Sequence, residues 1–247
     1  MNFLKSLLHF LLLVISLIPW ATYILLASLV LDKNKLYELG VMWLRFVIAS
    51  AKFILGIQVI AQHHSQLNIE NNRKIIYLAK HQSALETLLL PTLLPTHAAY
   101  VFKRELLAIP FFGWVLSRLD MIHIDRSKRS EAFQKVSNQG SQILANGTSI
   151  IIFPEGTRIP RGQKGTYKLG GARLAVATGA DVIPVAITSA KCWPRRAFIK
   201  TAGVVDVSFG PIVSTLGKSP EALMAEVENW IESEMHRLDP TAYVDQP

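Results

Sequence analysis

The feature that most constrains this chain is a run of 26 uncharged, mostly apolar residues, SLLHFLLLVISLIPWATYILLASLVL, from Ser6 to Leu31. A helix needs about 20 apolar residues to cross a bilayer. The run is too long for the apolar part of a signal peptide, and no small-x-small cleavage site precedes the next charges. We therefore expect a membrane-bound protein. Pro19, near the middle, is expected to kink the helix or to split it into two pieces.

A second apolar segment, VMWLRFVIASAKFILGIQVI (41–60), contains Arg45 and Lys52. Because these residues are seven positions apart, they fall on nearly the same side of a helix. A narrow cationic stripe on an apolar helix suits the bilayer interface better than a full crossing. The two segments together predict an N-terminal two-helix membrane anchor over residues 1–62, followed by a single domain over residues 63–247.

The charge is unevenly distributed along the chain. The net charge is +8 overall, but residues 71–200 carry +12 and residues 201–247 carry −6. A positive field attracts nucleic acid, anionic membrane or phosphorylated substrates. With an apolar anchor beside it, we expect the membrane bilayer as the partner and no nucleic acid. The basic region favours the cytoplasmic side, and we expect the bacterial inner membrane.

Beyond residue 70, short apolar runs alternate with longer amphipathic stretches. The runs predicted as strands are 75–79, 98–102, 121–124, 149–153, 182–187 and 204–209. Helices are predicted near 84–94, 105–118, 130–145 and 167–179, and a last helix begins after Ser219, with Pro220 at its first position. This alternation indicates an α/β fold with a mostly parallel sheet flanked by helices.

Polar clusters follow four of these predicted strands. They are His81, Lys103–Arg104, Asp125–Arg126 and Pro154–Arg158. In open α/β sheets, ligands bind beyond the carboxyl ends of the strands. The recurrence of polar clusters at this edge therefore predicts a site there.

The stretch KHQSALET (80–87) has two interpretations. Ser83 and Glu86 fit the S-x-x-E capping box, which would begin a helix near Ala84. Alternatively, His81 precedes the helix and contacts Glu86, whose carboxylate fixes the imidazole tautomer and leaves the other nitrogen free as a base. Both interpretations begin the helix at the same place, and they compete only for the carboxylate.

No protein nucleophile accompanies this His–carboxylate pair. The sequence lacks a G-x-S-x-G elbow and an H-E-x-x-H zinc motif, and Ser83 lies in the capping position. Cys192, the single cysteine, has no histidine near it in sequence and allows no internal disulfide and no cysteine-based zinc site. A His base without a protein nucleophile activates the hydroxyl of a substrate. Direct transfer to an alcohol acceptor follows.

The basic residues at the same edge indicate that this acceptor carries a phosphate. The residues that would surround it are Lys103, Arg126, Arg158 and Lys168. Each of them taken alone is more often a solvated surface charge. The segment FPEGTR (153–158) is a stronger signal, because Gly156 permits an unusual turn and close approach of a substrate. Glu155 would either hold Arg158 or bind a substrate hydroxyl.

Four motifs in this order resemble those of the glycerolipid acyltransferase superfamily, and within it the 1-acyl-sn-glycerol-3-phosphate (lysophosphatidic acid) acyltransferases. HQSALE (81–86) resembles the first motif, His-x4-Asp, with Glu86 where the family has Asp. The second corresponds to KRELLAIPFFGW (103–114) followed by IHIDR (122–126), the third to FPEGTR and the fourth to VIPVAI (182–187). Together they cover residues 80 to 187, close to half of the chain.

The resemblance implies that His81 is the general base and that Glu86 orients it. It implies that the acceptor is bound by Lys103, Arg126, Glu155, Gly156, Thr157 and Arg158. The reaction it implies moves a fatty acyl group from acyl-CoA or acyl carrier protein to the sn-2 hydroxyl of lysophosphatidic acid, giving phosphatidic acid in phospholipid synthesis. We expect no cofactor and no metal. The apolar segment 106–116 would either rest on the membrane near the entry of the acyl chains or pack in the core.

Three other functions stay open from the sequence. The protein could acylate another lysolipid or glycerol 3-phosphate. It could be a non-catalytic membrane protein that binds anionic lipid through its basic middle region, which would have no use for His81. It could also be a lipid hydrolase, which would need a nucleophile or a route for water and would release free fatty acid.

Overall fold

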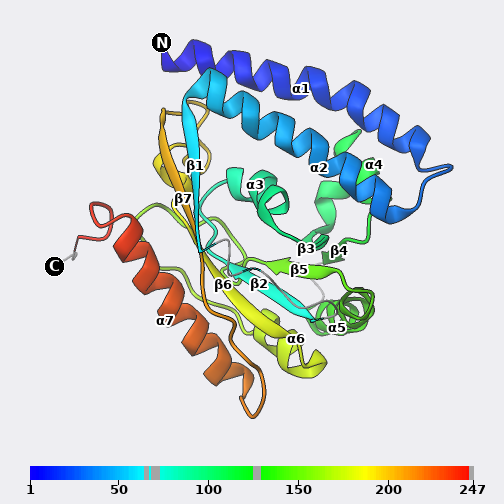
Figure 1. The fold of residues 1–247 in the computed structure, drawn as a ribbon, viewed down its shortest axis with the longest axis vertical. Coiled ribbons are helices and arrows are strands. Elements are labelled where there is room, and N and C mark those ends of the chain that lie inside the picture. Colours follow the sequence, from blue (N-terminus) through cyan, green and yellow to red (C-terminus); the bar gives the residue numbers. More distant parts are fainter. Residues whose placement is uncertain (64–66, 68–72, 125–128, 245–247) are drawn as a thin grey trace.

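The computed structural model describes residues 1–63, 67, 73–124 and 129–244 (Figure 1). Two helices, α1 (Asn2–Ala27) and α2 (Lys33–Ser50), open the chain, and a π-helical turn, η1 (Ala51–Leu55), extends the second. The strands are β1 (Ile57–Gln62), β2 (Ile75–Ala79), β3 (Ala98–Lys103), β4 (Ile122–Ile124), β5 (Ser149–Ile152), β6 (Asp181–Ile187) and β7 (Gly203–Phe209). The later helices are α3 (Leu85–Leu93), η3 (Arg104–Ala108), α4 (Phe112–Leu116), α5 (Arg129–Ala145), α6 (Gly170–Thr178), η4 (Ser189–Lys191) and α7 (Pro220–Leu238).

The strands form one sheet in the order β1-β7-β6-β2-β5-β3-β4. Strands β2 to β6 run parallel to their neighbours among themselves, whereas β7 is antiparallel to β6 and parallel to β1. The prediction of an α/β fold with a mostly parallel sheet flanked by helices is therefore confirmed. Since β2 lies in the middle of the sheet, the residues that follow it have neighbouring loops on both sides.

Helices cover both faces of the sheet (Figure 1): α5, α6 and α7 on one, and α1, α2 and α3 on the other. Side chains alternate between the two faces along a strand. In β2, Ile76 and Leu78 join the core beneath α6 and α7, and Ile75 and Tyr77 join the core beneath α3. All five residues of β2 are buried, which is why this strand reads as a continuous apolar run.

The N-terminal region differs in part from its prediction. Helix α1 is not split, because it continues through Pro19, and it is the one described helix long and apolar enough to cross a membrane. The second apolar segment, 41–60, is not a single helix. Gly56 ends it with a φ of +73°, a left-handed conformation that glycine adopts without strain. Strand β1 begins at the next residue and pairs with β7.

The division of the chain at residue 62 stays a prediction. Strand β1 lies before that boundary and is nevertheless the edge strand of the sheet that the later segments form. The helix predicted over 105–118 is interrupted in the structure, with η3 before Pro110 and α4 after it. A proline disfavours helical geometry at the residue before it, and Ile109 is extended, with φ −73° and ψ 118°.

Candidate active site

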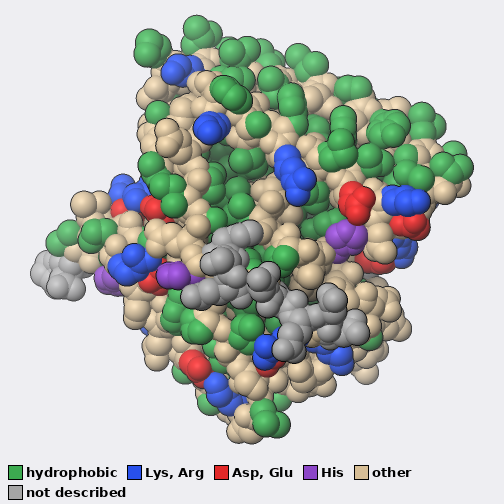
Figure 2. Space-filling model, viewed as in Figure 1, with side chains coloured by type: hydrophobic (Ala, Val, Ile, Leu, Met, Phe, Trp, Pro, Cys, Tyr) green, Lys and Arg blue, Asp and Glu red, His purple; other side chains and the backbone are tan. Residues whose placement is uncertain are grey.

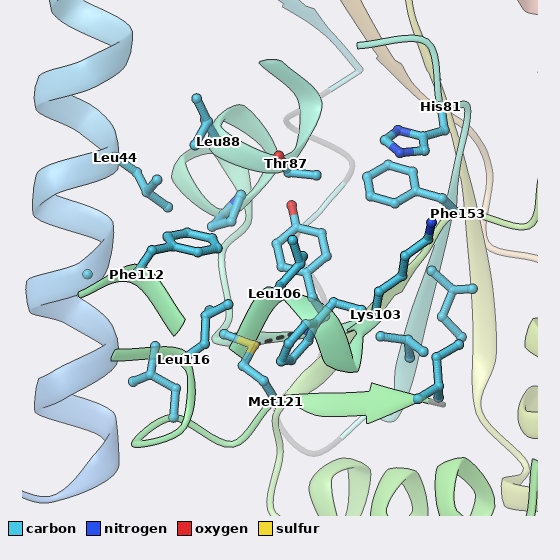
Figure 3. A pocket seen from close by; sticks show the side chains of 18 of the residues that line it. Leu44, His81, Thr87, Leu88, Lys103, Leu106, Phe112, Leu116, Met121 and Phe153 are labelled. Atoms are coloured by element: carbon cyan, nitrogen blue, oxygen red, sulfur yellow. Dashed lines mark hydrogen bonds between the residues drawn. The ribbon is translucent and has the colours of Figure 1, made fainter. Parts of the chain in front are cut away.

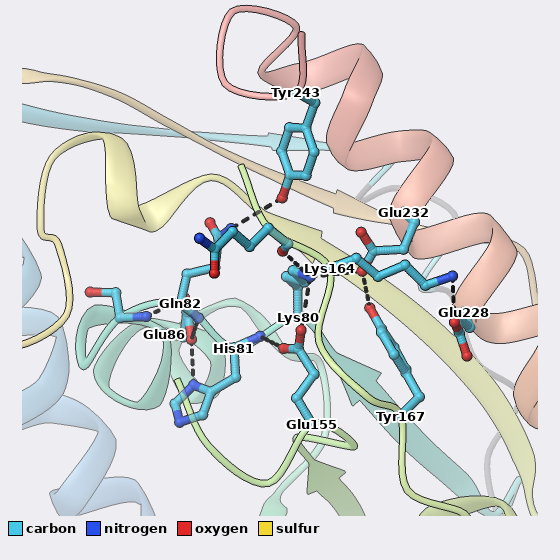
Figure 4. Close-up of polar contacts among 12 residues, drawn as sticks. Lys80, His81, Gln82, Glu86, Glu155, Lys164, Tyr167, Glu228, Glu232 and Tyr243 are labelled. Carbon is cyan, nitrogen blue, oxygen red and sulfur yellow. Dashed lines mark hydrogen bonds and ion pairs between the residues drawn. The ribbon is translucent and has the colours of Figure 1, made fainter. Parts of the chain in front are cut away.

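His81 and Glu86 are in direct contact at the carboxyl end of β2 (Figure 4). Nδ1 of His81 lies 2.6 Å from Oε2 of Glu86. The imidazole stacks on the ring of Phe153, with the centroids 4.0 Å apart and an angle of 18° between the planes. The other nitrogen, Nε2, has no hydrogen-bond partner among the described residues. With Nδ1–H donating to the carboxylate, Nε2 is left as a proton acceptor.

The carboxylate of Glu86 also organises the start of α3. Its oxygens accept the backbone N–H groups of Gln82 and Ser83, both at 2.8 Å, and the hydroxyl of the buried Ser189 donates to Oε1. Ser83 Oγ in turn accepts the N–H of Leu85 at 3.1 Å. The Glu86 half of the capping box and the contact with His81 are thus both present, since one carboxylate has enough lone pairs for the backbone N–H groups and the imidazole together. The competition for the carboxylate that we expected from the sequence therefore does not occur. The Ser83 half differs, because Ser83 Oγ accepts the N–H of Leu85 and not that of Glu86, and the N-cap of α3 is Ala84.

The loop after β5 holds the backbone of His81 from both sides. The N–H of His81 donates to Oε2 of Glu155 at 2.8 Å, and the N–H of Ile159 donates to the carbonyl of His81, also at 2.8 Å. The same loop is closed at its base by the N–H of Lys168 and the carbonyl of Pro154, 2.9 Å apart. The FPEGTR segment therefore fixes the position of the candidate base.

Lys80, one residue before His81, is the centre of a buried ionic cluster (Figure 4). Its side chain is fully buried, with Nζ 2.8 Å from Oε1 of Glu155 and 2.7 Å from Oε1 of Glu232 on α7. Nζ also donates to the carbonyl of Gln163 at 3.2 Å, and the hydroxyl of Tyr167 donates to Glu232 at 2.7 Å. We refer to Lys80, Glu155 and Glu232 as the buried triad.

The triad gives Glu155 contacts that neither interpretation of the sequence included. Glu155 is bonded to Lys80 and to the backbone of His81, and Arg158 is not among its described partners. Burial raises the pKa of Glu155, and the neighbouring Lys80 ammonium opposes that rise. Direct contact of Glu155 with a substrate stays a prediction.

A cavity of about 1230 Å³ lies in front of His81 (Figure 3). Much of its wall is apolar and comes from α1, α2, α3 and the η3–α4 segment, with Leu44, Leu88, Leu106, Phe112 and Leu116 among the lining residues. Segment 106–116 does not pack in the core: Leu106 and Phe112 line the cavity, and Ile109 and Trp114 are 43% and 48% exposed. Its contact with the membrane stays a prediction. The volume suits long apolar chains together with a polar head group.

Five basic residues line the same cavity: Lys103, Arg158, Lys168, Arg195 and Arg196. None of their side chains has an ion-pair or hydrogen-bond partner in the part of the chain that the structure describes. An unpaired cluster of cations in a cavity attracts an anion, and arginine provides the bidentate geometry that phosphate accepts.

The structure brings most of the predicted site residues together. His81, Lys103, Gly156, Thr157 and Arg158 line the cavity, and Glu86 supports His81 from behind. Gly156 has a φ of +66°, and a Cβ at this position would lie 2.9 Å from Nζ of Lys168. The unusual turn predicted for FPEGTR is therefore confirmed. Arg126 lies outside the described residues.

Sequence reasoning assigned no role in the site to Lys80, Glu232, Ser189, Arg195 or Arg196. The first three are buried polar residues whose partners are far away in the chain; Ser189 and Glu86, for example, are 103 residues apart. No local pattern indicates such contacts. Arg195 and Arg196 carried a usable signal, because they follow β6 as the other cationic clusters follow β3 and β5.

Comparisons with known proteins bear on what this site does. The family model described as acyltransferase matches residues 60–188. A 1-acyl-sn-glycerol-3-phosphate acyltransferase of Pseudomonas aeruginosa is 35% identical over 242 residues, which cover 96% of this chain and 92% of that protein. The alpha enzyme of that name from Homo sapiens is 29% identical over 187 residues, covering 74% and 64%. The crystal structure of the 1-acyl-sn-glycerophosphate acyltransferase PlsC from Thermotoga maritima matches with a TM-score of 0.81 and 25% identity over 96% of each chain.

Proposed function

Since this chain belongs to the acyltransferase family, as its motifs predicted, we propose that it acylates the sn-2 hydroxyl of 1-acylglycerol 3-phosphate, forming phosphatidic acid for phospholipid synthesis. The donor is a fatty acyl thioester, acyl-CoA or acyl carrier protein, and neither a cofactor nor a metal takes part. One observation carries the proposal. An imidazole backed by a buried carboxylate presents Nε2 to a cavity that is apolar in one part and lined by unpaired cations in another.

The chemistry proceeds in one direct transfer. Nε2 of His81 takes the proton of the acceptor hydroxyl while Nδ1–H continues to donate to Glu86. The hydroxyl oxygen attacks the thioester carbonyl, so a C–O bond forms, and collapse of the tetrahedral intermediate breaks the C–S bond. The imidazolium returns its proton to the departing thiolate. The carboxylate of Glu86 stabilises the transient imidazolium, as in a hydrolase triad that lacks its nucleophile.

The cavity supports the binding of a phosphorylated lipid. Lys103, Arg158 and Lys168 would take the phosphate, with Gly156 and Thr157 at the turn beside them. The apolar wall formed by the N-terminal helices and α4 would take the acyl chains. Because the reacting hydroxyl is only one carbon away from the phosphate-bearing carbon, binding the phosphate near His81 also places that hydroxyl near Nε2.

We further propose that α1 and α2 hold the enzyme at the cytoplasmic face of the bacterial inner membrane. Figure 2 shows hydrophobic side chains gathered along the α1 side of the molecule. Exposed apolar residues on these helices include Phe3, Leu8, Ile15, Tyr23, Met42 and Phe46. Apolar surface of this extent marks a membrane-binding region. Lipid chains would then move only a short distance from the bilayer into the cavity.

The proposal is tested with membranes that contain the full chain. Lysophosphatidic acid is supplied with acyl-CoA or acyl carrier protein thioester, and phosphatidic acid is measured for the wild type, His81→Ala and His236→Ala. His236 is an exposed histidine on α7 that does not line the cavity, so it controls for the loss of a histidine. We expect product from the wild type and the control, and a loss of at least about 100-fold in His81→Ala.

Three results would contradict the proposal. A wild type that makes no phosphatidic acid with either donor would show that the acceptor is a different lysolipid or glycerol 3-phosphate, or that the protein only binds anionic lipid. Full activity in His81→Ala would show that His81 is not the base. Release of free fatty acid without an acceptor would indicate hydrolysis instead.

A further inference from the structure

Two of the cavity cations, Arg195 and Arg196, have no role in the mechanism above. They lie in the loop that follows η4, beyond the carboxyl end of β6, and both line the cavity. Arg195 is partly buried and Arg196 is exposed. Within the described part of the chain, neither guanidinium has a carboxylate partner.

The sheet order places the strand that precedes these arginines on the opposite side of β2 from the strands that precede the other cations. Strand β2, which leads into His81, has β6 on one side and β5, then β3, on the other. Arg158 and Lys168 follow β5, and Lys103 ends β3. All four strands are parallel, so their following loops meet at one edge of the sheet. The strands that precede the two groups of cations therefore lie on opposite sides of β2, which leads into His81.

The loop that carries the arginines is fixed against α1. The N–H of Lys200 donates to Oγ of Ser6 at 2.9 Å, and the buried ring of Trp193 meets His9 edge-on, with centroids 5.6 Å apart. Within this fixed loop Arg196 has a φ of +60°, which is unfavourable for a residue with a Cβ. A strained backbone persists where the surroundings determine it, and such positions concentrate at binding sites.

One acceptor phosphate does not need both groups of cations. In 1-acylglycerol 3-phosphate the phosphate and the reacting hydroxyl are on neighbouring carbons, so the phosphate must lie on one side of His81. The thioester donors carry a second phosphate, because in acyl-CoA and in acyl carrier protein the thiol belongs to a phosphopantetheine arm. A site that joins these two substrates therefore has two phosphates to bind, one on the acceptor and one at the far end of the phosphopantetheine arm.

We propose that Arg195 and Arg196 bind the phosphate of the phosphopantetheine arm of the acyl donor. This inference rests on the proposed acyltransferase function and assigns the donor to the β6 side of His81. The acceptor phosphate then occupies the β5 and β3 side. Two guanidinium groups give bidentate contacts to a phosphate, which a point charge does not give.

The test pairs a change in the protein with a change in the donor. Acyl transfer to lysophosphatidic acid is measured with S-acyl-phosphopantetheine and with S-acyl-pantetheine of the same chain length, which lacks the phosphate. The enzymes are the wild type, Arg195→Gln/Arg196→Gly and the control Arg173→Ala. Glycine suits the left-handed backbone at 196, so this double variant is expected to fold. Arg173 is exposed on α6 and does not line the cavity.

We expect the double variant to lose at least about tenfold in kcat/KM with the phosphorylated donor and to match the wild type with the other donor. KM for lysophosphatidic acid should stay unchanged. An equal loss with both donors would overturn the proposal and place the arginines on the acceptor or on anionic lipid head groups, and a rise in KM for lysophosphatidic acid would identify the acceptor. No loss with either donor would also overturn it. A wild type inactive with both donors and also with acyl-CoA and acyl carrier protein thioester would instead contradict the proposed function.

Discussion

The two ionic regions on either side of His81 differ in how their charges are satisfied. Behind the imidazole, the ammonium of Lys80 is wholly buried and contacts two carboxylates within the protein. In front of it, the five cavity cations have no ion-pair partner among the described residues. The first region pairs its cation within the protein, whereas the described residues offer the second no counter-charge. We therefore expect the charges of the triad to contribute to stability and those of the cavity to contribute to binding.

The largest effect should come from breaking the buried triad. Lys80→Ala would leave Glu155 and Glu232 buried without their shared cation, and removing one partner of a buried ion pair costs about 3–5 kcal/mol. We expect a loss of this size in the free energy of unfolding, measured by denaturant titration in detergent. Lys164→Ala is the matched control, because Lys164 pairs with Glu228 but its side chain is 57% exposed. That loss should stay below about 1 kcal/mol.

The structural role that we assign to the buried triad would be wrong if Lys80→Ala destabilised the protein no more than Lys164→Ala. A triple variant, Lys80→Met/Glu155→Gln/Glu232→Gln, sharpens the same point. Removing all three charges leaves no unpaired ion, so most of the stability lost in the single variant should return. Activity need not return with it, because Glu155 also holds the N–H of His81.

A smaller effect, and one on binding instead of stability, is expected at the cavity. Arg158→Ala should lose about 1.5–3 kcal/mol of a charge-assisted hydrogen bond to the acceptor phosphate, which corresponds to about 10- to 150-fold in kcat/KM. Its free energy of unfolding should change by less than about 0.5 kcal/mol, because Arg158 has no hydrogen bond or ion pair from its side chain to the residues that the structure describes. Steady-state kinetics with varied lysophosphatidic acid measure the first, and denaturant titration measures the second.

Lys218→Ala is the control for Arg158→Ala, since Lys218 pairs with Glu226 far from the cavity lining. Lys218→Ala should leave both kcat/KM and the free energy of unfolding unchanged. A destabilised Arg158→Ala enzyme with normal kinetics would reverse the assignment and make Arg158 a structural residue.

The smallest expected effect is a dependence of stability on pH. Because burial raises the pKa of Glu155, the folded state holds this proton more tightly than the unfolded state does. The contribution of the group to stability is then fully present below the unfolded pKa, about 4.3, and is lost as the pH rises through the folded pKa. As the pH rises from the unfolded pKa through the folded pKa of Glu155, the wild type should therefore lose stability relative to Glu155→Gln. Thermal unfolding of both proteins at several pH values in detergent measures the difference, and a difference independent of pH would contradict the assignment.

The parts of the fold that could be predicted are those that depend on local pattern. IIYLA is both the predicted strand and β2, because its continuous apolar run needs no information from elsewhere. Ser219 caps α7 as predicted, accepting the N–H of Ala222 at 3.1 Å. Strand β1 could not be found in this way, since it continues the apolar run of the preceding helix and only Gly56 marks the change.

In the candidate site, too, only the features that depend on local sequence could be predicted. His81 and Glu86 are five residues apart, so their contact follows from where the helix begins. The contact between Lys80 and Glu232 joins residues 152 positions apart and depends on how α7 crosses the sheet. Nothing in the sequence around Lys80 distinguishes this buried ammonium from a solvated one. Long-range polar contacts of this kind require the three-dimensional structure.

The pairing of β1 with β7 has a consequence for how the protein is made. Ile57 lies beside Gly203 and Gln62 beside Ser208, so β1 has no partner in the sheet until the ribosome has synthesised β7. Helix α1 is synthesised before the strands, whereas completion of the sheet requires a contact between distant parts of the chain, which is slow to form. With the membrane attachment proposed above, α1 would bind the bilayer before the sheet is complete, while β1 is still unpaired.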